Sequence, residues 1–140
     1  MTGPVLGLRA AILARARADP ELATLMGGAV RLHDEPPRAA EPVYAVFGEA
    51  RARDESTDLG PAHWHEAAVV VWARPGSART ALEAAERLAA LLHEAALAPA
   101  GHRLVLVRVA AIESGRDAET GLATATLRLT ALTEPEGAAP

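Results

Sequence analysis

Histidines at alternate positions of a predicted strand have the spacing that best fits a metal site. His63 and His65 point to the same side of an extended chain and could bind zinc together. A third ligand would have to come from His33, His102 or a carboxylate, and nothing in the sequence fixes any of them nearby. We therefore predict no metal site, and interpret His63 and His65 as residues of an edge strand beside a loop.

A second arrangement, His93-Glu94, matches the first two residues of the His-Glu-x-x-His motif that binds zinc on a protease helix. That motif needs another histidine one turn later, where this chain has Leu97. None of the serines lies in a Gly-x-Ser-x-Gly context, and the sequence has no cysteine nucleophile. We predict that the protein is not an enzyme and has neither catalytic residues nor a cofactor. A small metal-binding α+β enzyme that uses His63 and His65 is the less favoured alternative.

Opposite charges are concentrated near the end of one predicted strand. The strand keeps its alternation past Gly48 although its last residues bury little, so we predict that 49–62 projects from the domain and contacts a partner. A mobile, solvated loop is the alternative. Exposed ion pairs there would each contribute at most about 1 kcal/mol. The candidate assembly residues are Glu49, Arg51, Arg53, Asp54, Glu55 and Asp58, together with Arg116 and Asp117 of a second predicted turn.

Helices are indicated by hydrophobic spacing and by their end signals. The spacing predicts a helix over 4–18, and Asp19-Pro20-Glu21 predicts a short second helix that ends at Gly27-Gly28. A long helix over 78–97 follows a predicted cap at Ser77. Its predicted buried stripe consists of Leu82, Ala85, Leu88, Ala89, Leu92 and Ala96.

Alternating or continuous apolar runs predict the strands, with a short extended piece at 30–33. The four main strands are expected at 43–53, 64–73, 102–113 and 122–133. The resulting order of helix, hairpin, helix, hairpin predicts an α+β fold, with a mainly antiparallel four- to five-stranded sheet and two long helices packed on one face. Residues 1–134 are expected to form a single domain, and 135–140 a flexible tail.

Composition limits the core and the partners. Hydrophobic residues make up 50% of the 140 residues but aromatic residues only 3%, so alanines must pack at close approach. The net charge of −4 argues against tight binding to a phosphate backbone. No apolar run reaches membrane-spanning length, and residues 1–8 have no basic leader pattern, so we expect synthesis in the cytoplasm.

The sheet is predicted to have more apolar surface than its helices can cover. Two helices cover one face of a four- or five-stranded sheet, yet 67–72 and 104–109 are apolar on both faces. In the first strand Val69 and Val71 oppose Val70 and Trp72. Because monomers rarely expose such a patch, we predict a subunit interface. The alternative is that 30–33 or the proline-rich loop after it folds over this face.

The chain as a whole resembles the tail-terminator, or tail-completion, proteins of long-tailed phages and gene transfer agents. The similarity covers about residues 8–134 and depends on the order and spacing of several segments rather than on one motif. These segments are Ala18–Leu22, Leu25–Val30, Pro42–Tyr44 with Gly48-Glu49, Val69–Ala73, Leu91–Ala95, Gly101–Val105 and Leu127–Thr133. The alanine and arginine excess is most similar to the gene-transfer-agent branch.

The resemblance implies an assembly function without chemistry. Such proteins form a hexameric ring on the head-proximal end of the tail tube, end its growth, and contact the neck or stopper protein in the particle. DNA passes through the lumen without specific binding. Six touching spheres of about 37 Å diameter leave a hole wide enough for a duplex, whereas three leave almost none. Another connector ring subunit, such as a stopper, is the alternative.

Overall fold

The computed structural model of the chain describes residues 2–39 and 41–137. Its elements follow the predicted order of helix, hairpin, helix, hairpin. The helices are α1 (Pro4–Arg17), α2 (Pro20–Leu25) and α3 (Ala78–Leu92). The strands are β1 (Leu32–His33), β2 (Val43–Asp54), β3 (His63–Ala73), β4 (His102–Arg116) and β5 (Ala123–Pro135). Among the described residues, no helix combines the length and the apolar character needed to cross a bilayer.

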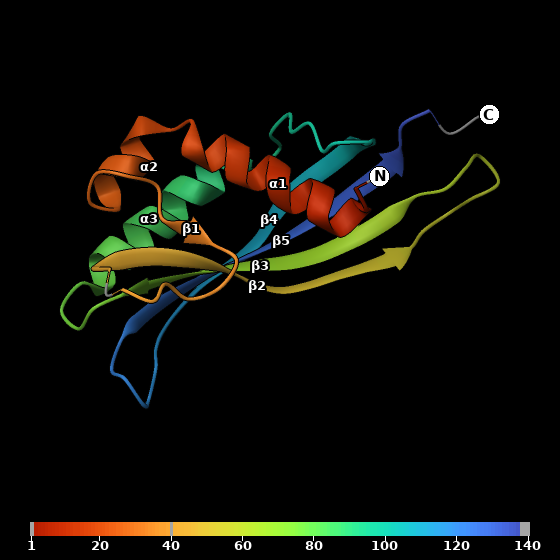
Figure 1. Ribbon diagram of the computed structural model, residues 1–140. Helices are drawn as coiled ribbons and strands as arrows, with labels where there is room; N and C mark the ends of the chain where they lie inside the picture. The colour runs from red at the N-terminus through yellow and green to blue at the C-terminus, as the bar shows by residue number, and fades with distance from the viewer. Residues whose placement is uncertain (1, 40, 138–140) are drawn as a thin grey trace.

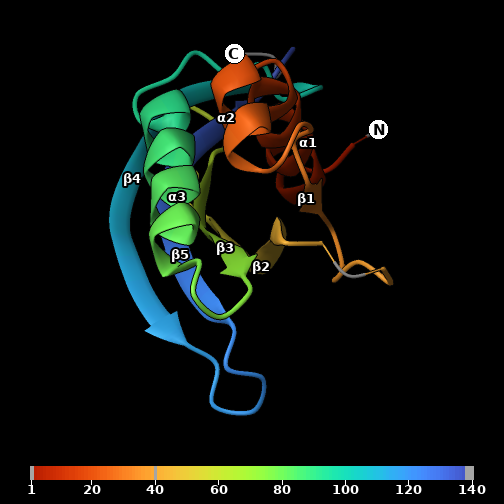
Figure 2. The ribbon, with the colours of Figure 1, turned by 90° about the vertical axis from the view of Figure 1, so that its left-hand side faces the viewer.

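The strands form one mixed sheet in the order β1-β2-β3-β5-β4. β1 pairs parallel with β2, and the other three pairs are antiparallel. The described helices all lie on one side of the sheet (Figure 1), which curves around α3 when seen from its end (Figure 2). This confirms the predicted α+β class with helices on one face. We call the side of the sheet away from the helices the open face.

Small side chains let α3 lie close to the sheet. Ala81, Ala84 and Ala85 are fully buried and belong to the same core cluster as Ala125 and Ala131 of β5. The prediction of close alanine packing is therefore confirmed. The buried stripe is shifted by one position on the helix. It includes Ala81, Ala84 and Leu91 beside the expected Ala85, Leu88 and Leu92, while Leu82 and Ala89 are half-buried.

The predicted C-terminus of the long helix is wrong by five residues. Helix α3 ends at Leu92, and Glu94 turns the chain with a φ of 55°. The backbone N–H of Glu94 donates to the Val107 carbonyl at 3.0 Å, and Nδ1 of His93 accepts from the N–H of Val109 at 3.0 Å. These two bonds pair backbone groups on the outer edge of β4. They form in place of a further helical turn, although residues 95–97 favour a helix.

Two expected end features also differ. Ser77 occupies the N-cap position of α3, but its side chain makes no capping hydrogen bond. β5 continues through Pro135, and the N–H of Glu136 donates to the Gly101 carbonyl at 3.0 Å, so the first part of the expected tail is bound to the domain. Residues 138–140 of that expected tail lie outside the described residues.

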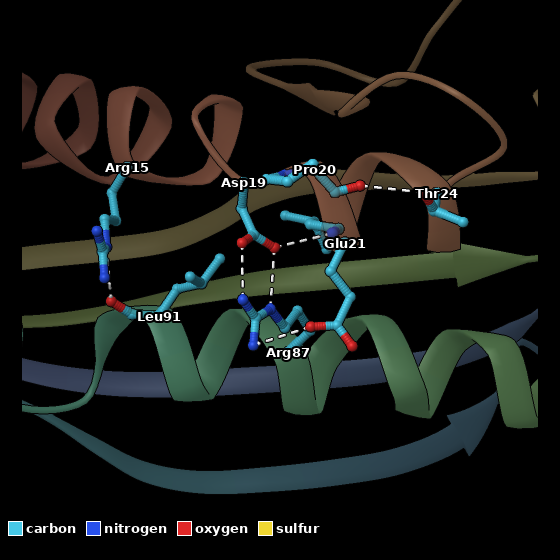
Figure 3. Close-up of polar contacts among 8 residues, drawn as sticks. Arg15, Asp19, Pro20, Glu21, Thr24, Arg87 and Leu91 are labelled. Carbon is cyan, nitrogen blue, oxygen red and sulfur yellow. Dashed lines mark hydrogen bonds and ion pairs between the residues drawn. The ribbon is translucent and has the colours of Figure 1, made fainter.

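Asp19 ties the three helices together (Figure 3). Its Oδ2 accepts from the N–H of Leu22 at 2.8 Å, as the predicted N-cap of α2 requires. Both carboxylate oxygens also accept from the guanidinium of Arg87 on α3, at 2.7 and 2.9 Å. These hydrogen bonds from Arg87, more than any other interaction, lower the pKa of Asp19 to about 2. The short helix is thereby fixed to α3 as well as capped.

Candidate assembly surface

The end of β2 and its connection to β3, residues 49–62, form a projection that we call the arm. A bulge between Phe47 and Ala50 separates it from the start of β2. Beyond the last strand pair, the N–H of Glu55 donates to Ala62 at 2.9 Å, and Thr57 and Gly60 exchange two backbone hydrogen bonds. The tip, at the far right of Figure 1, is therefore a hydrogen-bonded turn. The loop expected over 54–62 continues the hairpin in irregular form.

An apolar residue stands at this tip. Leu59 is 97% exposed, more than any other large hydrophobic side chain among the described residues. It borders a shallow hollow that also contains Trp64 and Leu132. Trp64 and Leu132 are direct neighbours across β3 and β5, and they lie on the open face because the adjacent His65 and Thr133 are buried beneath the helices. The hollow therefore extends the apolar part of the open face toward the end of the molecule.

The charged residues of the arm make local contacts. Arg53 lies 2.9 Å from Glu55, 3.8 Å from Glu66, and stacks over the Trp64 ring at 6.0 Å from its centroid. Hydrogen bonds from Ser56 lower the pKa of Asp54. Exposed pairs of this kind contribute little to stability, so their main effect is to fix the shape and charge of the tip.

The predicted assembly residues do not form one cluster. Arg116 is the last residue of β4 and Asp117 begins the turn to β5, next to the Ala73–Ala123 pair, whereas the outer part of the arm lies next to the His63–Thr133 pair. These rows are separated by about 33 Å along β5. Asp117 is held in its turn by the N–H and hydroxyl of Thr120, at 2.9 and 2.7 Å, which lower its pKa.

Two further predicted residues of the arm, Glu49 and Arg51, border a second hollow. This hollow lies between the arm and the middle strands and also contains Arg128. Arg128 forms an ion pair with Glu113 at 2.5 Å, and this hydrogen-bonded pair raises the pKa of Arg128, with a smaller contribution from the charge of Glu49. The middle of the open face is therefore charged.

A second apolar area lies at the opposite end of the open face. Tyr44 pairs with Trp72, and Val46 pairs with Val70 across β2 and β3. We call these four residues the aromatic patch. Tyr44, Val70 and Trp72 are half-buried, and Val46 is 9% exposed. The predicted apolar open face is thus present in this region of β2 and β3.

The prediction that 104–109 is apolar on both faces needs a correction. Register shifts at Val105 and Ala110 place Leu104 opposite Thr133 but Leu106 opposite Leu132. Leu104 therefore packs with the helix-side core, and Leu106 alone extends the open face beside Leu132. A bulge has this effect because one extra residue reverses the side on which every following residue points.

The alternative prediction, that 30–33 or the proline-rich loop folds over the open face, is only partly correct. β1 joins the sheet edge beside β2 and does not cross the open face. The proline-rich loop reaches the β1 edge, where a carboxylate oxygen of Glu41 lies 2.7 Å from Nε2 of His33 and can accept a hydrogen bond from it. Burial and the nearby Glu41 charge raise the pKa of Tyr44. Val70 and Trp72 lie further from this edge, on the neighbouring strand.

The interpretation of the histidines as edge-strand residues is wrong. β3 is the central strand, and His65 is only 2% exposed, with Nε2 at 2.8 Å from the Thr133 hydroxyl. Burial lowers the pKa of His65, and the neighbouring His63 and His102 lower it further. Within the described ranges, no group of three potential ligands is placed to hold a metal ion.

Comparison with known proteins identifies the family. The sequence profile of the family described as "Tail completion protein gp17" matches residues 10–134, which is most of the chain. The chain belongs to the tail completion protein gp17 family. This confirms the resemblance proposed from the sequence, and the protein is accordingly a structural protein of phage-like tails rather than an enzyme.

A solved structure supports this membership of the tail completion family. The chain is similar to one in the structure entitled "Virion of native gene transfer agent (GTA) particle", with 27% sequence identity and a TM-score of 0.84. The similarity covers 95% of this chain and 99% of that chain. No curated protein sequence matches this tail completion protein significantly.

Sequence reasoning placed the arm but missed its apolar tip. The concentration of charge favoured Arg53 and its acidic neighbours as the contact residues. Leu59 is the lone large apolar residue in the polar run 54–60, and that isolation was the available signal. Its association with Trp64 and Leu132 depends on the strand order, which places β5 beside β3 and is not visible in the sequence.

Proposed function

We propose that this tail completion protein forms a closed ring of six copies on the head-proximal end of a tail tube. The observation that carries the proposal is the pair of different apolar surfaces at opposite ends of the open face. A closed ring needs such heterologous contacts, in which one patch of each copy meets a different patch of the next. The similarity to a chain of a gene transfer agent virion supports a place in the tail of such a particle.

The ring stops growth of the tube and joins the tail to the neck. Its partners are the tail tube protein on one side and a neck or stopper protein on the other. DNA crosses the lumen without specific binding, in keeping with a net charge of −4. The protein is made in the bacterial cytoplasm and becomes part of the tail or neck of a phage or gene transfer agent.

Deletion of the gene tests this function. We expect tailless heads and tubes of uncontrolled length in electron micrographs, because nothing ends polymerisation or provides the neck surface. Expression of the wild-type chain in trans should restore attached tails of uniform length. Normal attached tails in the deletion strain would contradict the proposal. Tubes of normal length that fail to attach would instead indicate a stopper.

A further inference from the structure

The exposed leucine of the arm is the starting observation. Leu59 lies in a turn that two backbone hydrogen bonds between Thr57 and Gly60 hold closed, and its own N–H donates to the Thr57 hydroxyl at 3.2 Å. A backbone held this way loses little freedom on binding, so burial of the Leu59 side chain in a partner has a smaller entropy cost than it would from a mobile loop. Trp64 and Leu132 continue the apolar surface behind it.

The same chain carries a matching apolar surface that its own arm cannot reach. The aromatic patch contains Trp72, eight positions from Trp64 on β3, or about 27 Å away. The tip of the arm, where Leu59 lies in the turn between Thr57 and Gly60, extends beyond Trp64 in the opposite direction (Figure 1). The two surfaces can therefore meet only between different copies of the chain.

Charge favours the same pairing. The tip contains three acidic residues, Asp54, Glu55 and Asp58, and its one arginine, Arg53, is already engaged by Glu55 and Glu66. Arg74 is exposed and comes directly after the end of β3, two positions from Trp72. The acidic tip is therefore complementary in charge to the Arg74 end of the patch, whereas Glu41, near Tyr44 at the β1 edge, is paired with His33. This difference between the two borders of the patch would orient the contact.

We propose that the arm of one subunit docks on the aromatic patch of the next subunit, with Leu59 against Val70 and Trp72 and the acidic tip residues near Arg74. This inference rests on the proposed ring and assigns its subunit contact. The occupant of the aromatic patch is a second copy of this chain, and each copy contributes an arm to one neighbour and a patch to the other.

The absence of natural cysteines gives a direct test. Two single-cysteine variants, Leu59→Cys and Val70→Cys, are mixed, assembled with tube protein and treated with a short bis-maleimide crosslinker. We expect a dimer that contains one copy of each variant. The matched control replaces Val70→Cys by Leu6→Cys, since Leu6 is an exposed leucine of α1, 62% exposed and on the helix side. That mixture should give no such dimer.

A second measurement does not depend on crosslinking. Leu59→Ser should weaken association of adjacent subunits about 10- to 100-fold, the effect of losing one buried leucine contact. Leu6→Ser should leave association unchanged. Rings that persist with Leu59→Ser, or assembled rings in which Leu59→Cys and Val70→Cys give no mixed dimer, would overturn this contact while leaving the ring proposal intact. Wild-type chains that form no ring even with tube protein would overturn both.

Discussion

Some residues act through local contacts, which the sequence predicts, and others through contacts with distant parts of the chain, which it does not. The Asp19 cap followed from an Asp-Pro-Glu pattern because capping is local. Its pairing with Arg87, 68 positions away, could not be predicted, because it depends on how α3 packs. His65 was misassigned for the same reason: alternation placed it on a face, but only the strand order makes that face the core.

Replacement of Asp19 by asparagine should reveal this pairing through its pH dependence. Asp19 has a pKa of about 2 in the folded protein, against 3.8 for an ordinary aspartate, so its contribution is complete above 3.8 and is lost as pH falls toward 2. At neutral pH, Asp19→Asn should lower the free energy of unfolding by about 1–2 kcal/mol. Urea unfolding should show this difference shrinking across that acidic window.

An exposed ion pair on α3 provides the control for Asp19. Arg79 lies 3.3 Å from Glu83, with their side chains 93% and 47% exposed. Glu83→Gln should change the free energy of unfolding by less than about 0.5 kcal/mol. An equal loss for Asp19→Asn and Glu83→Gln, or a difference for Asp19→Asn that stays constant at low pH, would contradict the role assigned to Asp19.

His65 should behave as a core residue. His65→Ala removes the partner of the buried Thr133 hydroxyl and leaves a cavity, with an expected loss of about 2–4 kcal/mol. The half-buried His63 provides the comparison, and His63→Ala should cost about 1 kcal/mol or less. Equal effects of the two substitutions in urea unfolding would show that His65 is not part of the core.

The lowered pKa of His65 also determines how its contribution to the free energy of unfolding changes with pH. The neutral imidazole is favoured in the folded state, so stability is present above 6.5, the ordinary pKa of histidine, and is lost as pH falls through the lower folded value. His65→Gln cannot take up this proton and should lose less stability between neutral and mildly acidic pH. Identical pH profiles for wild type and His65→Gln would exclude this titration.

At the scale of elements, the sequence predicted the type and order of helices and main strands but not their exact ends. Hydrophobic period and caps are local, and they were sufficient for α1, α2 and the main strands. The end of α3 and the bulges of β4 depend on long-range hydrogen bonds, such as that from Glu94 to Val107. These bonds override the helix preference of the residues after Leu92.

Close alanine packing makes α3 sensitive to added volume. Ala84 is fully buried, so Ala84→Leu should lower the free energy of unfolding by about 1–3 kcal/mol through strain against the sheet. Ala90 is exposed on the same helix, and Ala90→Leu should stay within about 0.5 kcal/mol of wild type. Urea midpoints give both values. A harmless Ala84→Leu would mean that α3 lies less closely on the sheet than described.

At the scale of the whole molecule, the arrangement of helices determines what is left for partners. All described helices cover one face, so the open face keeps apolar areas at both ends and charges between them. The sequence indicated this excess of apolar surface, because β3 is apolar on both sides. It could not locate the two areas, since their separation depends on the register of β3 with β2 and β5.

The most direct test of the proposed ring is an electron micrograph of the purified protein, alone and mixed with its tail tube protein. We expect rings of six subunits with a central opening, seated on one end of the tubes. Tubes assembled with the protein should also be shorter and more uniform than tubes assembled without it. Rings that appear only on tubes would agree with this expectation. A protein that stays monomeric under both conditions, and leaves tube ends bare and tube lengths unchanged, would contradict it.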